Sequence, residues 1–217
     1  MVRKRLMLIL VMFTVLGSLI AGQSLFAESR GKVLIIMRPN NPADDPANPP
    51  KLIGDYMILR EFGVMKTALM DAGFTVVVAT ENGDPVEGQT VSVKPDLKLS
   101  DVKAADYKGI MLPCMHSASN PPEAVRIIKD AIAKGVPIAA QNGGVLLMGM
   151  AGGLKGKKFT TSSFIANFIK EGTYSGDDVV QDGNIVTSSY CPFMAHYFRG
   201  GQDTTLELTQ MFIAILQ

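Results

Sequence analysis

The chain has 217 residues, with 21 Lys and Arg against 20 Asp and Glu and a formal net charge of +1. This balance excludes the strongly basic surface that nonspecific nucleic-acid binding requires. Hydrophobic residues make up 47% of the chain, which is enough for one domain with a full core.

The first 27 residues are predicted to be a secretory signal peptide. Residues 3–5 are basic, residues 6–20 are apolar, and Ala27 ends a plausible cleavage site. An uncleaved membrane anchor is the alternative, because residues 6–27 carry no charge and are long enough to cross a bilayer. Loss of the three basic residues leaves 18 basic against 20 acidic side chains, a net charge of −2. We expect residues 28–217 to form a single exported domain, periplasmic or secreted, with no stable membrane insertion after cleavage.

The N-terminal half begins with a β-α-β pattern. Residues 32–37 form an apolar run typical of a central parallel strand, and residues 38–50 are rich in Asn and Pro and predict a surface loop. Residues 54–72 predict a helix that Gly73 ends, and residues 75–80 predict the second strand. The apolar stripe of that helix comprises Met57, Ile58, Phe62, Met65, Leu69 and Ala72.

The middle of the chain continues the alternation of strands and helices. A small hairpin is expected near residues 91–93, and a short helix capped by Ser100 is expected over residues 100–105. Residues 109–113 predict a buried strand, and residues 114–120 its loop. The next helix starts at Pro121 or Pro122 and ends before Gly135, as the backbone preferences of Pro and Gly favour.

A sharp strand-to-helix turn follows. Residues 137–141 predict a strand and residues 145–151 a helix, so the chain must turn within residues 141–144. Such a turn forces its apex, Asn142, toward positive φ and lifts the side chain above the sheet edge, as in a nucleophile elbow. Asn tolerates this conformation, but its amide is not an acyl-transfer nucleophile.

The C-terminal part completes an α/β domain. It is expected to contain a short strand, a helix, a hairpin with a type I′ turn at Asp182-Gly183, and a closing helix after a Thr204/Glu207 capping box. The order predicts a three-layer α/β/α sandwich with a mostly parallel, flavodoxin-like central sheet. Ligands bind outside the carboxyl ends of the strands in such sheets. The first two elements are predicted over residues 158–160 and 164–170, the hairpin over 179–187 and the last helix through Leu216.

The pattern resembles the ThiJ/PfpI (DJ-one) superfamily, within the class I glutamine amidotransferase-like fold. The resemblance covers nearly all of residues 28–217 and implies a homodimer as in many relatives. The family's activities include glyoxalase or deglycase, amidase or protease, chaperone and isocyanide hydratase. The stretches that carry the resemblance are Lys-Val-Leu-Ile-Ile (32–36), Ala-Gly-Phe-Thr-Val-Val-Val-Ala (72–79), Tyr-Lys-Gly-Ile-Met-Leu-Pro (107–113), Gly-Val-Pro-Ile-Ala-Ala (135–140), Gly-Leu-Lys-Gly-Lys-Lys (153–158) and Asp-Gly-Asn-Ile-Val-Thr-Ser (182–188).

The resemblance assigns the site residues and shows where this chain departs. Glu61 matches the carboxylate that relatives carry on their first helix. Asn142 stands where relatives have the nucleophilic cysteine, and Gly143 stands where they have the next histidine. The standard cysteine mechanism is therefore not expected, and a pseudoenzyme is one interpretation.

Two cysteines are expected beside the elbow if the fold is that of the family. The loop that reads Pro-Gly-Gly in relatives reads Pro113-Cys114-Met115-His116 here, and the hairpin exit reads Tyr190-Cys191-Pro192. The predicted ligand pocket comprises Met115, Gly143, Gly144, Tyr190 and Pro192, with Glu61, Asn142, Cys114, His116 and Cys191 as candidate catalytic residues.

Two functions remain open. In the first, the protein binds a small molecule, Glu61 hydrogen-bonds the Asn142 amide, and the N–H groups near Gly143 and Gly144 form an anion-binding corner. In the second, a non-canonical hydrolase, glyoxalase/deglycase-like or amidase-like, uses Glu61 with Cys114 or Cys191. The bases considered for the second function are His116 and His196.

The two cysteines leave a redox or metal role open as well. A Cys114–Cys191 disulfide fits an oxidising compartment, and Zn²⁺ held by Cys114, His116, Cys191 and His196 has suitable ligand types without a diagnostic spacing. We predict no metal and no cofactor.

Overall fold

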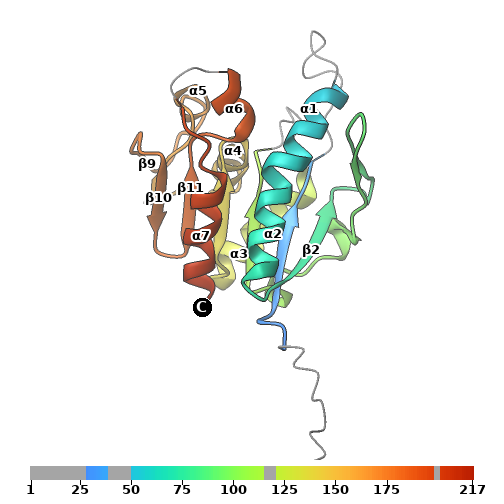
Figure 1. Cartoon of the computed structure of the whole chain (residues 1–217). Helices are drawn as coiled ribbons and strands as arrows, with labels where there is room; N and C mark the ends of the chain where they lie inside the picture. Colours follow the sequence, from blue (N-terminus) through green and yellow to red (C-terminus); the bar gives the residue numbers. More distant parts are fainter. Residues whose placement is uncertain (1–27, 39–49, 115–120, 198–200) are drawn as a thin grey trace, which may run out of the picture.

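The computed structural model of the chain describes residues 28–38, 50–114, 121–197 and 201–217. Within them, seven strands form one sheet that is parallel except at the edge strand β10 (Figure 1). The strands, in spatial order, are β10 (Val179–Asp182), β11 (Ile185–Ser188), β7 (Ile138–Gln141), β6 (Gly109–Leu112), β1 (Lys32–Ile36), β2 (Thr75–Thr80) and β5 (Leu97–Lys98).

Helices cover both faces of this sheet, which confirms the predicted three-layer α/β/α architecture (Figure 1). On one face a long helical segment lies beside the C-terminal helix. This segment comprises α1 (Pro50–Met57), a π-helical turn (Ile58–Phe62) and α2 (Gly63–Asp71), and its neighbour is α7 (Thr205–Leu216). The other face carries α3 (Pro122–Lys134) and α4 (Gly143–Met150).

The remaining short elements lie outside the seven-stranded sheet. Two short strand pairs lie outside it, and two 3₁₀ turns precede β6. These elements are β3 (Val86–Glu87) with β4 (Ser92–Val93), β8 (Lys158–Phe159) with β9 (Thr173–Tyr174), the 3₁₀ turns Leu99–Asp101 and Ala104–Asp106, and the short helices α5 (Ser163–Ala166) and α6 (Pro192–Tyr197).

The central strands are buried on both faces because their side chains alternate between two cores. In β1, Val33 and Ile35 belong to the core under α2 and α7, whereas Leu34 and Ile36 belong to the core under α3 and α4. All four side chains are at most 2% exposed. This explains why the strand reads as one continuous apolar run.

The predicted hairpin turn is wrong in its register and type. Asp182 pairs with Ile185, so Gly183 and Asn184 are the two turn residues. Only Gly183 has a positive φ, of 63°, whereas a type I′ turn needs positive φ at both positions. A glycine at the first of the two turn positions is the feature of a type II′ turn.

Three local helix predictions are also wrong. Ser100 does not cap a helix, because it lies inside the 3₁₀ turn Leu99–Asp101, which extended residues 102 and 103 separate from the turn Ala104–Asp106. The capping box does not form either: Thr204 Oγ1 donates to the Tyr190 carbonyl, and Asp203 Oδ1 accepts from Thr205 N instead. The helix predicted over residues 164–170 is confined to α5, where Ser162 accepts from Ile165 N.

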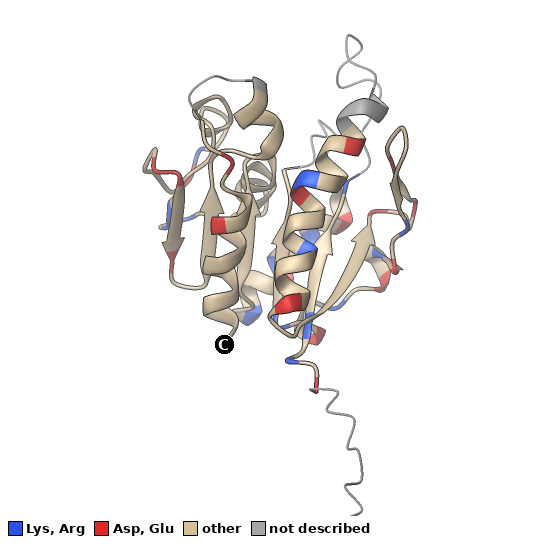
Figure 2. Ribbon diagram, in the orientation of Figure 1, with Lys and Arg blue, Asp and Glu red and all other residues tan. Residues whose placement is uncertain are grey.

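Residues 1–27, which include the predicted signal peptide, lie outside the described residues. In the described part of the chain, every helix is too short or too polar to span a bilayer. Acidic and basic side chains are interspersed on the face drawn in Figure 2, and both signs occur along α2.

Gly144 gives the first testable prediction, because a Cβ there would lie 2.3 Å from the backbone oxygen of Leu112. We expect Gly144→Ala to lower the free energy of unfolding by about 1–3 kcal/mol, since a backbone carbonyl cannot move aside easily. Gly149→Ala in the same helix is the matched control, because its Cβ would meet only side chains at 3.4 Å or more. It should be neutral, or stabilising by up to about 1 kcal/mol. Urea denaturation measures both, and equal losses would contradict the account.

Candidate functional site

Asn142 lies at the apex of the turn between β7 and α4, as predicted. Its backbone has φ 41° and ψ −102°, and it is the only non-glycine residue with positive φ in the described part of the chain. Its N–H donates to the Ser188 carbonyl at 2.9 Å, and its carbonyl accepts from Val145 N at 2.9 Å. A conformation of this kind costs of order 1–3 kcal/mol and persists only where the surrounding structure fixes it.

Two glycines let the turn press against the end of β6. A Cβ on Gly143 would lie 2.6 Å from the Cys114 carbonyl oxygen, and one on Gly144 would clash with Leu112. The start of α4 therefore sits against the strand end that carries Cys114. This close approach places the first cysteine at the elbow.

The Asn142 side chain links the two cysteines to the loop before α5. Its Oδ1 accepts from Ser162 Oγ at 2.8 Å, from Thr161 Oγ1 at 3.3 Å and from Ser162 N at 3.4 Å. Because a backbone N–H can only donate, the oxygen faces Ser162 and Nδ2 faces the sulfurs. Nδ2 donates to Cys114 Sγ at 3.5 Å and to Cys191 Sγ at 3.9 Å. The predicted hydrogen bond between Glu61 and the Asn142 amide is therefore wrong. Asn142 Nδ2 donates to the two sulfurs instead, and Oδ1 accepts from Thr161 and Ser162.

Both cysteines are free thiols, and their pKa values shift in opposite directions. A hydrogen bond from the Cys191 thiol, the Gly143 N–H, the positive charge of Arg38 and the Asn142 amide together lower the pKa of Cys114 from 9.0 to about 7, against the effect of burial. The same hydrogen bond, burial and the negative charges of Cys114 and Glu61 raise the pKa of Cys191. Cys114 is thus the first thiol of the pair to ionise as the pH rises, and Cys191 keeps its proton to higher pH.

Glu61 fixes the backbone of Cys114. It lies in the π-helical turn, is fully buried, and accepts from Cys114 N at 2.7 Å through Oε1. Arg38 Nη2 donates to the Cys114 carbonyl at 2.8 Å. One peptide unit on each side of Cys114 is therefore held by a charged, buried side chain.

Several contributors were missed from the sequence. Arg38 follows the carboxyl end of β1, at the edge of the sheet where ligands bind in this fold class. Nothing in the sequence around it indicates a contact with Cys114. Thr161 and Ser162 fall between the elements predicted over residues 158–160 and 164–170, and the sequence gives no signal for a role in the site. The π-helical turn has no simple sequence signal, although such turns are often found at functional sites.

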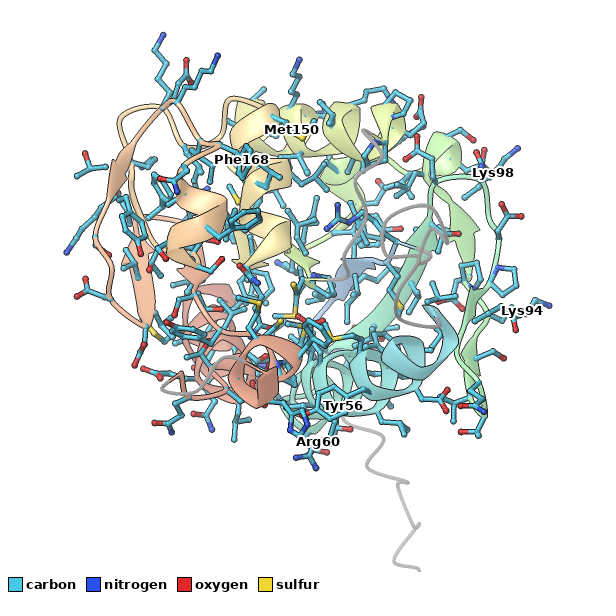
Figure 3. All side chains as sticks on the ribbon, turned by 90° about the horizontal axis from the view of Figure 1, so that it is seen from above. Tyr56, Arg60, Lys94, Lys98, Met150 and Phe168 are labelled. Carbon is cyan, nitrogen blue, oxygen red and sulfur yellow. The ribbon has the colours of Figure 1, made fainter. Side chains whose placement is uncertain are left out.

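Other predicted pocket residues take part through their backbones or lie elsewhere. The Tyr190 carbonyl accepts from Gln141 Nε2 at 2.9 Å, and the Pro192 carbonyl accepts from Tyr56 Oη at 3.4 Å. Tyr56 also packs against the exposed His196 ring at 5.8 Å, and Figure 3 shows Tyr56 and Arg60 together at the rim of the molecule. Met115 and His116 lie outside the described residues. In the part of the chain that is described, no three His, Cys, Asp or Glu residues form a group that could hold a metal ion.

The chain matches the model of one protein family and is similar to one archaeal protein. The model of the DJ-1/PfpI family matches residues 52–199. An uncharacterized protein of Archaeoglobus fulgidus is 35% identical over 126 residues, which are 55% of this chain and 75% of that protein.

Solved structures share the fold. Drosophila melanogaster DJ-1beta has a TM-score of 0.63 at 23% identity, over 86% of this chain and 90% of that one. A ThiJ/PfpI domain protein from Brachyspira murdochii has a TM-score of 0.65 at 16% identity, over 87% and 97%. A two-domain protein from Anabaena variabilis, with dj-1/thij/pfpi-like and ferritin-like domains, has a TM-score of 0.65 at 20% identity over 86% of this chain. This chain spans 48% of that protein.

The thiol pair gives the second prediction. Because only the thiolate is nucleophilic, the alkylation rate of Cys114 by iodoacetamide should rise with pH through a midpoint of about 7, and fall away below it. Cys191→Ala removes the largest stabilising donor and should move the midpoint upward, whereas Cys191→Ser keeps a hydroxyl donor and should move it less. Peptide mass spectrometry follows each cysteine separately. A Cys114 midpoint near 9.0 in the unmodified protein would refute the assignment.

Proposed function

The chain belongs to the DJ-1/PfpI family, and we propose that it binds a small electrophilic molecule at the Asn142 elbow, with the Cys114 thiolate as its reactive group. The observation that carries the proposal is the set of donors around Cys114 Sγ. The Gly143 N–H, the Asn142 amide and the Cys191 thiol all point to this sulfur. Residue 142 then acts as a positioning residue.

A small aldehyde or 2-oxoaldehyde suits this arrangement. The Cys114 sulfur forms a bond to the carbonyl carbon, the π pair moves to the oxygen, and the oxygen takes a proton from the Cys191 thiol or from solvent. The product is a hemithioacetal, whose formation is reversible. Cys114 is only 7% exposed and Asn142 only 4%, so the proposal is restricted to small ligands.

The positions of Glu61 and Arg38 support capture rather than turnover. Glu61 Oε1 accepts a hydrogen bond from the Cys114 N–H, and Arg38 Nη2 donates one to the Cys114 carbonyl. Both groups fix the direction of the Cys114 side chain, and neither contact requires proton transfer. We therefore assign Glu61 a positioning role, and keep glyoxalase/deglycase-like or amidase-like turnover as the alternative function.

Export and dimerisation belong to the same proposal. The basic and apolar start of the chain motivates export with cleavage after Ala27, and the family resemblance motivates a homodimer. Expression in a bacterial host with cell fractionation tests the first: a protein that begins at Glu28 in the periplasm or medium is expected. An unprocessed chain in the membrane fraction would support the anchor instead.

The proposed homodimer is tested by light scattering, which should give twice the chain mass. A monomer would rule out the dimer.

Carbonyl capture is tested with methylglyoxal. Preincubation at pH 8 should slow the alkylation of Cys114 several-fold without consuming the aldehyde. Asn142→Asp keeps the side-chain size but places a carboxylate beside the sulfurs, so it should raise the Cys114 pKa and weaken capture at pH 7. Cys191→Ser keeps a hydroxyl donor beside the Cys114 sulfur, so it should weaken capture less than Asn142→Asp does.

Two results would contradict this proposal. Unchanged alkylation of Cys114 in the presence of methylglyoxal would exclude capture. Steady formation of a 2-hydroxy acid that Glu61→Gln abolishes would replace the binding function by the enzymatic alternative.

A further inference from the structure

We infer that Cys114 and Cys191 are a redox-active pair in which the Cys114 sulfur reduces a small hydroperoxide and Cys191 resolves the product as an intramolecular disulfide. The inference rests on the Cys114 thiolate of the proposed function, but it assigns Cys191 a role that carbonyl capture does not require. It also names a second class of substrate, hydroperoxides.

The first support is the position of the two sulfurs. They come from loops that are distant in the sequence, after β6 and before α6, yet both accept from Asn142 Nδ2, at 3.5 and 3.9 Å. The Cys191 thiol in turn donates to the Cys114 sulfur. Both sulfurs thus contact the same amide nitrogen, and this places the two thiols in one cluster from which a disulfide can form.

The second support is the unequal exposure of the two residues. Cys114 is 7% exposed, whereas Cys191 is 0% exposed. The cysteine that must meet an oxidant from solvent is therefore Cys114, and Cys191 needs only to meet Cys114. This is the order of an attacking and a resolving cysteine.

The third support is the distribution of charge. Donors at Cys114 favour its thiolate and lower its pKa, while the negative charges of Cys114 and Glu61 raise the pKa of Cys191. An attacking sulfur must be deprotonated, and the resolving sulfur must hold a proton that it can give to the leaving oxygen. The pair meets both conditions before any oxidant arrives.

The oxidation takes place in two steps, and an external dithiol reverses it. The Cys114 thiolate attacks one oxygen of the hydroperoxide, the O–O bond breaks, and the leaving alkoxide or hydroxide takes the proton of Cys191. Cys114 is now a sulfenic acid and Cys191 a thiolate. The Cys191 thiolate attacks the Cys114 sulfur and expels hydroxide, which takes a proton from solvent to give water. An external dithiol returns the disulfide to two thiols by exchange.

The disulfide has a consequence for the proposed function. It removes the Cys114 thiolate, so the oxidised protein should lose carbonyl capture until a dithiol restores it. The elbow would then respond to the oxidising state of its compartment. The disulfide would also protect Cys114 from irreversible oxidation to the sulfinic or sulfonic acid.

The test is treatment of the reduced full chain with one equivalent of hydrogen peroxide at pH 7, followed by N-ethylmaleimide and mass spectrometry. We expect the loss of two hydrogen atoms per chain, no alkylated cysteine, and a Cys114–Cys191 cross-linked peptide that dithiothreitol removes. Accumulation of Cys114 sulfinic acid with Cys191 still alkylated would overturn the inference. Two cysteines that escape oxidation, so that no disulfide is found, would overturn it as well.

Two variants keep the test decisive. Cys191→Ser, which is nearly isosteric, should stop at a Cys114 sulfenic acid that dimedone traps, while Cys114→Ser should leave Cys191 unoxidised. Equal oxidation of Cys191 in both the unmodified protein and Cys114→Ser would contradict the assigned order. If the disulfide fails to form while the reduced, unmodified protein still captures methylglyoxal, only this inference fails. If the disulfide forms and no aldehyde is captured, only the proposed function fails.

Discussion

The site depends on one close backbone approach, between the turn at residues 142–144 and the end of β6. The Leu112 carbonyl would lie 2.3 Å from a Cβ at Gly144, and the Cys114 carbonyl 2.6 Å from one at Gly143. Only glycines permit this packing, and it forces Asn142 into its positive-φ conformation. The position of the Cys114 sulfur beside the Gly143 N–H follows from it. In the proposed function, the nucleophile of the elbow is therefore Cys114, at the neighbouring strand end, because Asn142 cannot act as one.

Electrostatics then decides which sulfur carries the charge. Burying an ionised group is costly unless donors or an opposite charge compensate it. Cys114 has the hydrogen bond from Cys191, the Gly143 N–H, the Arg38 charge and the Asn142 amide, whereas the pKa of Cys191 is raised by that hydrogen bond, by burial and by the negative charges of Cys114 and Glu61. Above a pH of about 7, the pair therefore holds one negative charge, on the Cys114 sulfur. Asn142 fits this role because its amide can donate to sulfur while its oxygen anchors Ser162.

The sequence predicted the parts of the fold that depend on burial and on local backbone preference. Central strands such as β1 are apolar on both faces and read as continuous runs, and a strand followed closely by a helix required a turn at Asn142. The family resemblance placed both cysteines beside that turn. Partners that belong to other elements were not predictable: Arg38, Thr161 and Ser162 reach the site only through tertiary packing. The capping box failed for the same reason, because the Tyr190 carbonyl takes the Thr204 hydroxyl.

The central claim is that Cys114, and not residue 142 or Cys191, carries the reactive charge of the elbow. The most direct measurement is the pH titration of the two cysteine Cβ chemical shifts by NMR in reduced, ¹³C-labelled protein. The account predicts that the Cys114 Cβ titrates with a midpoint of about 7, while the Cys191 Cβ keeps the shift of a thiol throughout that range. Titration of Cys191 first, or of both cysteines together near 9.0, would contradict it.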